Sequence, residues 1–311
     1  MKLKQRLLRH AVKTSLRLAF KLPSRLPLPV GLLRAGMDRG AGLLPLRADA
    51  RVQQLHLAGV ATEQVSVGQA KQSALLHLHG GAFMVGSPAS HRALAGELAA
   101  RSGAQVFVPD YRLAPEHPYP AAQDDCLSAW QGLLDAGFAA EQIILSGDSA
   151  GGALALNLVL RLKAMNQPLP AALVLMSPYV DSSLQAASIT SKRRRDPMLT
   201  RQVLKRGSSS YAASLALDDA RISPLFADLA GLPPVLIQVG SEEILLDDAL
   251  RLEAVCQAAG VDVSCRVYDG MWHDFQLFSR FLPEAQAALD DMTRFMTQQL
   301  RRQGSQVGTK S

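Results

Sequence analysis

Residues 147–152 have the sequence Gly-Asp-Ser-Ala-Gly-Gly, which places Ser149 between glycines where two hydrophobic patterns meet. The apolar run 142–145 comes before them, and the Ala- and Leu-rich stretch 153–165 follows. A short apolar run followed by a long one predicts strand, sharp turn and helix. A serine at the apex of such a turn has strained backbone geometry, and glycine leaves room where a Cβ would meet neighbouring segments. This feature constrains the chain to hold a serine hydroxyl above the edge of a sheet.

An ordinary glycine-rich strand–helix turn has the same short pattern, so the rest of the chain has to decide. Apolar β-like runs alternate with helical ones along most of it, which is typical of a parallel, doubly wound sheet covered on both faces. Two alternating runs joined at Gly59 predict an antiparallel hairpin that opens this sheet. About eight strands are expected, at 51–58, 61–67, 74–78, 105–109, 142–145, 171–176, 234–239 and 263–268, with helices at 89–101, 121–136, 153–165, 247–259 and 283–302.

The chain of 311 residues is long enough for one large α/β domain with a small cap. Residues 1–50 form the predicted N-terminal cap arm, with helical patterns at 2–21 and 30–40. Residues 51–302 form the predicted core. The polar stretch 181–231 interrupts the alternation, so we expect it to be an insertion over the carboxyl edge of the sheet. Residues 303–311 are predicted to be a disordered tail.

Charge is unevenly distributed along the chain. The net charge is +6, but residues 1–50 hold 11 Lys and Arg against 2 Asp and Glu, so the remainder is mildly acidic. A nucleic-acid-binding function therefore has little support, and no nucleic-acid partner is expected. The basic amphipathic pattern at 2–21 is compatible with a helix that packs its apolar face on the body, which we favour, or with peripheral contact to a membrane surface. The basic run 192–195 is interpreted as a solvated face of the cap.

Three cysteines, Cys126, Cys256 and Cys265, lack metal-ligand spacing and are an odd number, which favours free thiols in a reducing compartment. The N-terminus lacks the pattern of a secretory signal. We therefore expect a cytoplasmic protein with no metal and no cofactor. The sequence leaves open whether the chain forms a homodimer.

Polar residues with catalytic chemistry follow several predicted strands at the edge where ligands bind in doubly wound sheets. Ser149 follows the strand at 142–145, acidic residues follow the strand at 234–239, and His273 follows the strand at 263–268. A weak serine nucleophile needs a histidine to accept its proton and a carboxylate to orient that histidine. The chain order of nucleophile, acid and histidine is that of an acyl-transfer triad on an α/β sheet. The acid comes from among Glu242, Glu243, Asp247 and Asp248.

The strand at 74–78 leads into His79, Gly80 and Gly81. Their main-chain N–H groups, with that of Ala150 at the head of the next helix, are expected to form an oxyanion hole from Gly80, Gly81 and Ala150. His79 is interpreted as bracing this loop, His77 as a core residue and Asp148 as support beneath the serine turn. Side chains near the site could line a substrate pocket or be ordinary packing, and these are Phe83, Met84 and Trp272. Asp110 and Arg112 are expected to form an ion pair within a scaffold loop.

Several spaced motifs together resemble the hormone-sensitive-lipase-like esterases, bacterial family IV. These are the oxyanion motif at 79–83, the serine turn at 147–152, and the segments 110–116, 119–122, 196–199, 223–225 and 232–234. The resemblance covers roughly residues 75–275. It implies an α/β-hydrolase fold with an N-terminal cap arm and metal-free hydrolysis of short-chain esters. It also implies that Glu243 is the acid, because this position matches the Asp that many relatives carry there. Asp247 and Asp248 are interpreted as the start of a helix, where carboxylates are favoured in any case.

The sequence thus predicts a serine carboxylesterase that works through an acyl-enzyme, with the triad Ser149, Glu243 and His273 acting on a small ester. A lactone or natural-product ester on the same triad is an alternative within the enzyme class. A second class is a non-catalytic ligand receptor on the same fold. The presence of His273 after its strand disfavours the receptor.

Overall fold

The computed structural model describes residues 3–26, 28–42, 44–69 and 71–307. Their centre is a single eight-stranded sheet in the order β1-β2-β4-β3-β5-β6-β7-β8. The strands are β1 (Ala50–Leu57), β2 (Val60–Val67), β3 (Ala74–Leu78), β4 (Gln105–Pro109), β5 (Ile143–Asp148), β6 (Ala172–Met176), β7 (Val235–Gly240) and β8 (Val263–Tyr268). Strands β1 and β2 form the predicted hairpin, and β2 also pairs antiparallel with β4. All other pairs are parallel. The predicted mostly parallel, doubly wound sheet is confirmed.

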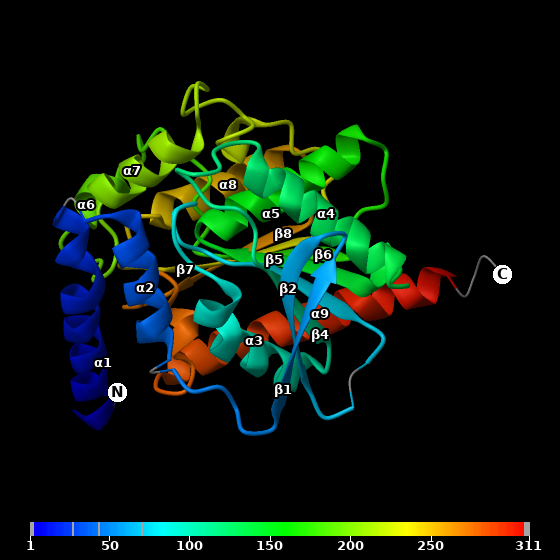
Figure 1. The fold of residues 1–311 in the computed structure, drawn as a ribbon, viewed down its shortest axis with the longest axis horizontal. Coiled ribbons are helices and arrows are strands. Elements are labelled where there is room, and N and C mark those ends of the chain that lie inside the picture. The colour runs from blue at the N-terminus through cyan, green and yellow to red at the C-terminus, as the bar shows by residue number, and fades with distance from the viewer. Residues whose placement is uncertain (1–2, 27, 43, 70, 308–311) are drawn as a thin grey trace.

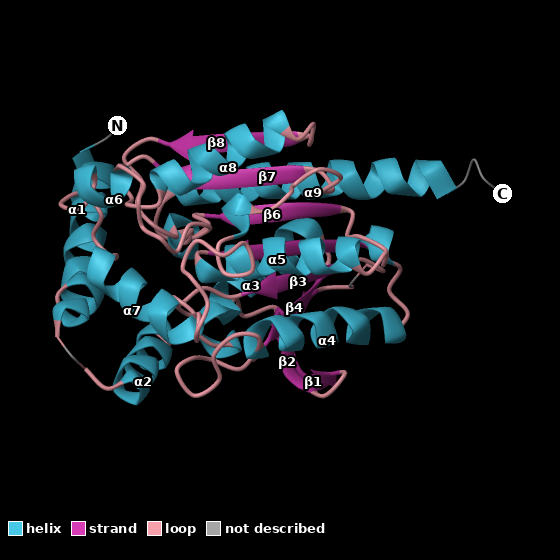
Figure 2. Ribbon diagram, turned by 90° about the horizontal axis from the view of Figure 1, so that it is seen from above, coloured by secondary structure: helices cyan, strands magenta, loops and turns pink. Residues whose placement is uncertain are grey.

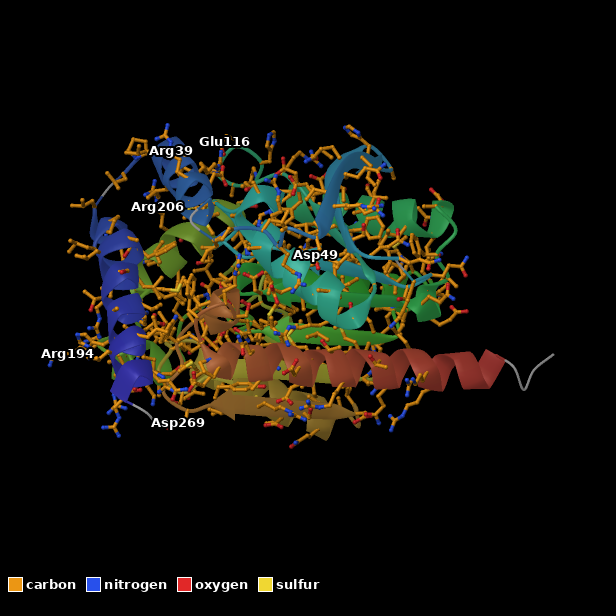
Figure 3. All side chains as sticks on the ribbon, turned by 90° about the horizontal axis from the view of Figure 1, so that it is seen from below. Arg39, Asp49, Glu116, Arg194, Arg206 and Asp269 are labelled. Atoms are coloured by element: carbon orange, nitrogen blue, oxygen red, sulfur yellow. The ribbon has the colours of Figure 1, made fainter. Side chains whose placement is uncertain are left out.

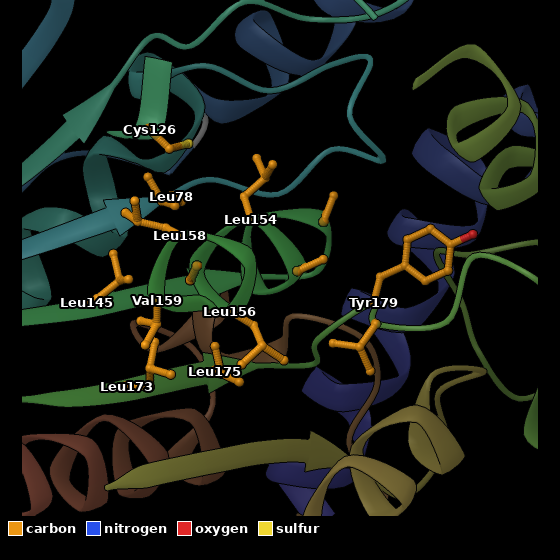
Figure 4. Close-up of a cluster of buried hydrophobic side chains, with 14 of the residues drawn as sticks. Leu78, Cys126, Leu145, Leu154, Leu156, Leu158, Val159, Leu173, Leu175 and Tyr179 are labelled. Carbon is orange, nitrogen blue, oxygen red and sulfur yellow. The ribbon is translucent and has the colours of Figure 1, made fainter. Parts of the chain in front are cut away.

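The central strands are buried along their whole length, which explains why they are continuous apolar runs in the sequence. Helices α4 (Ala121–Asp135), α5 (Ala150–Ala164) and α8 (Leu246–Ala258) cover one face, and α3 (Pro88–Ser102) and α9 (Pro283–Val307) cover the other (Figure 1). Each face has its own apolar cluster. Figure 4 shows the first of these, in which side chains of α5 such as Leu158 and Val159 lie against Leu145 and Leu173 of the sheet.

The predicted cap comprises the N-terminal arm and the predicted insertion. The arm holds α1 (Leu3–Leu16), a π-helical turn (Arg17–Lys21), a 3₁₀ turn (Pro23–Arg25) and α2 (Val30–Ala41). The insertion holds α6 (Ser188–Ser191), α7 (Arg201–Tyr211) and a 3₁₀ turn (Pro224–Phe226). Figure 2 shows all four cap helices gathered at the end of the sheet where the parallel strands finish. The helices of the predicted cap therefore lie at the edge at which the sequence places the candidate site residues (Figure 2).

Inner contacts hold α1 on the body. Leu16 is buried in a cluster with Met271, Trp272 and Phe275, from the segment after β8. On the same side of the helix, Lys13 pairs with an acidic residue of the loop after β7. The packing interpretation of the N-terminal helix therefore accounts for its inner face.

Two remaining elements are short 3₁₀ helices, at Ala140–Gln142 and Phe275–Phe278. Helix α9 continues to Val307, so five residues of the predicted tail are helical, and residues 308–311 lie outside the described residues. Within the described part of the chain, no helix is both long and apolar enough to span a bilayer.

Candidate active site

The turn between β5 and α5 has the strained geometry that the sequence predicts. Ser149 has φ 50° and ψ −120°, a conformation that L-residues rarely adopt. A Cβ on Gly147 would lie 2.2 Å from the carbonyl oxygen of Gly151, and one on Gly151 would lie 1.9 Å from that of Leu78. Main-chain bonds hold the apex, because Ser149 N–H donates to Met176 O and Ser149 O accepts from Tyr179 N–H, both at 2.9 Å. The serine is thus fixed by its backbone.

The loop after β3 lies directly against this turn. A Cβ on Gly80 would lie 2.2 Å from Oδ2 of Asp148, and Gly81 has φ +128°, so both positions require glycine. The predicted brace is present: Nδ1 of His79 lies 2.8 Å from Gly80 O, and the Tyr111 hydroxyl donates to His79 O at 2.6 Å. None of the N–H groups of the predicted oxyanion hole donates to an acceptor among the described residues. Free donors of this kind are what a developing oxyanion needs.

Glu243 and His273 are brought together at the ends of β7 and β8. Oε2 of Glu243 lies 2.9 Å from Nδ1 of His273, and both residues are buried. Oε1 of Glu243 accepts from Gly240 N–H and from the Ser177 hydroxyl, the latter at 2.8 Å. A carboxylate that accepts three donors has a fixed orientation, so it fixes the ring of His273 as well.

The competing carboxylates have other partners. Glu242 pairs with Lys13 of α1. Asp247 accepts from Ser188 N–H at 2.8 Å, and Asp248 accepts from two N–H groups of the segment after β6, at 3.0 and 3.1 Å. Both aspartates lie in the first turn of α8, as expected. Of the four candidates, Glu243 is the one whose carboxylate contacts the histidine.

The other ring nitrogen of His273 is occupied by a neighbour that the sequence reasoning did not consider. Nε2 lies 2.9 Å from Oδ2 of Asp274, and the described residues form no hydrogen bond between the ring and the hydroxyl of Ser149. Burial alone lowers the pKa of His273, but Asp274 and Glu243 outweigh burial and hold it well above 6.5. Burial raises the pKa of Asp274 to about 7, against the attraction of His273. Ser149 and His273 thus lie at one edge of the sheet, with the ring turned to a carboxylate.

Beneath the serine turn, Asp148 contacts two buried histidines. Nε2 of His91 lies 3.2 Å from Oδ2 of Asp148, and Nε2 of His77 lies 3.1 Å from Oδ1 without the alignment of a hydrogen bond. Their Nδ1 atoms lie 2.8 and 2.9 Å from the hydroxyls of Ser90 and Ser146. Burial lowers the pKa of His91, yet Asp148 holds it above its usual value. Burial raises the pKa of Asp148, yet the two imidazoles hold it well below.

These three residues are also the one group among the described residues whose ligand atoms are near enough to share a metal ion. Direct contacts already pair the Asp148 carboxylate with imidazole nitrogens, and each ring has a serine hydroxyl at its other nitrogen. We therefore interpret the group as a buried charge pair that supports the turn, as predicted for Asp148 and His77.

The three side chains predicted near a pocket are packed and nearly inaccessible. Phe83 stacks on Tyr211 of α7, with ring centroids 4.2 Å apart. Met84 O accepts from Nε of Arg34 at 2.8 Å, and Trp272 lies in the cluster of Leu16. Their role in a pocket stays a prediction.

Sequence reasoning missed Ser177, Asp274 and His91. Ser177 follows β6 directly, so its place at a strand end was the signal that could have indicated it. Asp274 is adjacent to the candidate base, which was a signal. His91 lies on α3, and nothing in its local sequence indicates the contact with Asp148. Arg112 pairs with Asp125 of α4 at 2.7 Å, so the predicted pairing with Asp110 is wrong.

The sheet, the strained serine turn and the strand-end histidine define an α/β-hydrolase. In agreement, residues 75–277 match the family model described as the alpha/beta hydrolase fold. An esterase of Acinetobacter venetianus is 42% identical over 289 residues, which cover 93% of this chain and 95% of that protein. An acetyl-hydrolase of Streptomyces hygroscopicus is 40% identical, covering 71% of this chain and 74% of that protein.

Solved structures narrow the assignment. The crystal structure of an esterase from the bacterial hormone-sensitive lipase family superposes with a TM-score of 0.89 at 34% identity, covering 96% of this chain and 99% of that one. The esterase EstE5 superposes with a TM-score of 0.91 at 35% identity, covering 94% and 99%. The chain belongs to the hormone-sensitive-lipase-like carboxylesterases of the α/β-hydrolase fold.

Proposed function

We propose that the chain hydrolyses short-chain carboxylic esters with Ser149 as nucleophile, His273 as general base and Glu243 as the acid that orients it. The observation that carries this proposal is the buried 2.9 Å contact between Glu243 and Nδ1 of His273, two residues of separate strand ends. This contact holds Nδ1 of the His273 ring in place, so Nε2 is the ring atom that can exchange a proton with Ser149. The strained apex that presents Ser149 supports the same assignment.

The reaction follows from these positions. Above the pKa of the ring, Nε2 of His273 loses its proton to water, leaves Asp274 and accepts a hydrogen bond from Oγ of Ser149, while Nδ1 keeps its bond to Glu243. Oγ attacks the ester carbonyl as its proton moves to Nε2, and the oxyanion is bound by the N–H groups of Gly80, Gly81 and Ala150. The tetrahedral intermediate collapses, and the leaving alcohol takes the proton from Nε2. Water then attacks the acyl-enzyme by the same route and releases the acid and the free serine.

The burial of the site supports the choice of short acyl groups. Ser149 and His273 are 3% and 2% exposed, so solvent reaches them little beneath the cap. One relative is named an acetyl-hydrolase, and an ethyl acetate hydrolase of Pseudomonas putida is 33% identical over 235 residues, which cover 73% of this chain and 74% of that protein. An acyl-chain-length series extended to lactones tests this choice. A preference for lactones would change the proposed substrate from open-chain esters to lactones and would leave the proposed triad unchanged. Phe83, Met84 and Trp272 are proposed to border the acyl or the alcohol site.

Labelling and hydrolysis test the assignment together. Ser149→Ala should abolish hydrolysis of a short p-nitrophenyl ester and covalent labelling by a fluorophosphonate probe, because both need an activated Oγ. Retained activity in this variant would refute the role of Ser149. A wild-type chain that neither labels nor hydrolyses would instead favour a ligand receptor on this fold.

The proposed setting is the cytoplasm, supported by three cysteines that are all unpaired. Contact of the N-terminal arm with a membrane surface is part of the proposal and is developed below. A homodimer is a further proposal, tested by light scattering.

A further inference from the structure

Helix α1 and the π-helical turn after it carry apolar side chains on two opposite sides. On the inner side, Leu16 is 4% exposed and packs against the body. On the outer side, Leu7 and Leu18 are each 63% exposed. Leu7 and Leu16 are nine positions apart in the helix, and at about 100° per residue they point in opposite directions. Packing on the body explains only the inner side.

More exposed leucines lie along the arm. Leu22, Leu26 and Leu32 follow, and each is more than half exposed. Figure 1 shows α1 at the outer flank of the molecule, away from the sheet. Several exposed leucines on one segment are unusual for a surface that faces only water.

Basic side chains accompany these leucines. Residues 1–37 contain no Asp or Glu. Arg6 and Arg17 are exposed on α1 and its π-turn, and neither forms an ion pair with another described residue. The acidic residues that α1 does contact, Glu242 and Glu284, are already paired with its inner basic residues. The outer side of the arm is therefore both apolar and positively charged.

The basic run that the catalytic site leaves unexplained lies beside this surface. Lys21 of the arm donates to the carbonyl oxygen of Arg193, which holds the run against the end of the π-helical turn. Arg193, Arg194 and Arg195 are exposed, and Figure 3 shows Arg194 next to α1. Two segments far apart in the sequence thus build one surface.

We propose that this surface docks the enzyme on an anionic lipid bilayer. The basic–leucine face is defined by exposed residues of α1, of the end of its π-helical turn and of the basic run: Leu7, Leu18, Leu22, Arg6, Arg17, Arg193, Arg194 and Arg195. Leucines buried in the headgroup region and arginines facing anionic headgroups are the two contributions that hold an interfacial helix. A two-fold contact with a second copy would bring like charges together, so the charge pattern favours lipid.

Docking here would place the catalytic site next to the membrane. Lys13, on the inner side of the same helix, pairs with Glu242 and lies over the ring of Trp272 at 5.4 Å. These are the residues directly before Glu243 and His273. This part of the inference rests on the proposed function, and it names esters dissolved in a bilayer as accessible substrates.

Flotation with vesicles of neutral phosphatidylcholine, with or without anionic phosphatidylglycerol, measures the binding. The full chain should float with the anionic vesicles, bind neutral ones much more weakly and be released by high salt. The double variant Leu7→Gln with Leu18→Gln should lower the partition coefficient of the protein onto anionic vesicles by about tenfold or more. Arg193→Gln with Arg194→Gln should weaken it by roughly fivefold for each charge removed. Leu250→Gln with Met165→Gln, two exposed apolar residues elsewhere, is the matched control and should float as the wild type does.

The outcomes separate binding from catalysis. Ser149→Ala should float normally, and the arm variants should hydrolyse a water-soluble short ester at the wild-type rate. Absence of flotation with anionic vesicles at low salt would overturn the docking proposal, as would equal flotation of the arm and control variants. A dimer in light scattering that is lost in Leu7→Gln with Leu18→Gln, without lipid binding, would assign the face to a second copy instead.

Discussion

Replacing Asp274 with asparagine should lower the apparent pKa of the acid limb of the pH–rate profile, the limb on which activity falls as the pH is lowered. Its carboxylate lies 2.9 Å from Nε2 of His273, and both residues are buried. An opposite charge this close shifts a pKa by about 1–3 units toward the charged form. His273, the proposed base, can accept a proton only as neutral imidazole, so its raised pKa should suppress activity below that pKa. Asparagine keeps the shape of the side chain and removes its charge, so the apparent pKa of the acid limb should fall by about one unit or more.

Several other ionisable groups face Asp274, and the variant keeps them all. Glu243, Asp148 and His91 act on it or on His273 from three other elements. Asp196, whose Oδ2 accepts from the N–H next to Glu243, interacts with the ring as well. The limb should therefore stay above that of a free histidine, because Glu243 still favours the imidazolium.

The assay is kcat/KM for a short ester across acid to alkaline pH, followed in a pH-stat. A shift of one unit makes the variant about tenfold faster, relative to its own plateau, at a pH well below the wild-type limb. Asp269→Asn is the control, because that carboxylate is exposed and solvent screens it. An unmoved limb in Asp274→Asn, or equal shifts in both variants, would refute the electrostatic reasoning.

Two further substitutions test the support of the site. Glu243→Gln should reduce kcat on the order of 10⁴-fold, because the ring loses its orienting carboxylate, whereas Asp247→Asn should change it little. The reverse ranking would move the role of the acid. His91→Ala should cost about 3–5 kcal/mol in the free energy of unfolding, because it leaves Asp148 buried with one partner removed. The raised pKa of His91 means that its ion pair stabilises the fold below about pH 6.5 and is lost as pH rises through the folded value. The deficit in chemical denaturation should therefore shrink at alkaline pH, and a similar deficit in the exposed His117→Ala would contradict the reasoning.

The sequence predicts the strands well, because strands buried on both sides are continuous apolar runs between turn residues. It also predicts which residues follow the strands, so Ser149, Glu243 and His273 could be named before their geometry was known. Partners across loops were harder. Arg112 reaches Asp125 because its loop folds back on α4, and a local pattern does not encode that path.

The same limit applies to the histidine ring. Its Nδ1 partner follows from the family pattern, whereas the partner of Nε2 depends on the backbone of the next residue. Asp274 has φ 51° and ψ 37°, a left-handed conformation that Asp tolerates better than most residues. Its N–H donates to the Ser177 hydroxyl at 3.2 Å, and its carboxylate lies at the ring. Neither feature is visible in an apolar or polar pattern.

At the serine turn, Asp148 contributes to holding the backbone, whereas the hydroxyl of the adjacent Ser149 does not. A strained apex persists only where its surroundings determine it completely. At this turn, two sets of contacts hold the backbone. Asp148 is held by its contact with His91, and Ser149 is held by its main-chain hydrogen bonds. The Ser149 hydroxyl forms no hydrogen bond with the described residues, so it takes no part in holding the turn. Strain, buried charge and an unbonded hydroxyl therefore occur together at this turn: the Asp148 contacts and the main-chain bonds fix the backbone, and the hydroxyl of Ser149, the proposed nucleophile, stays free to react.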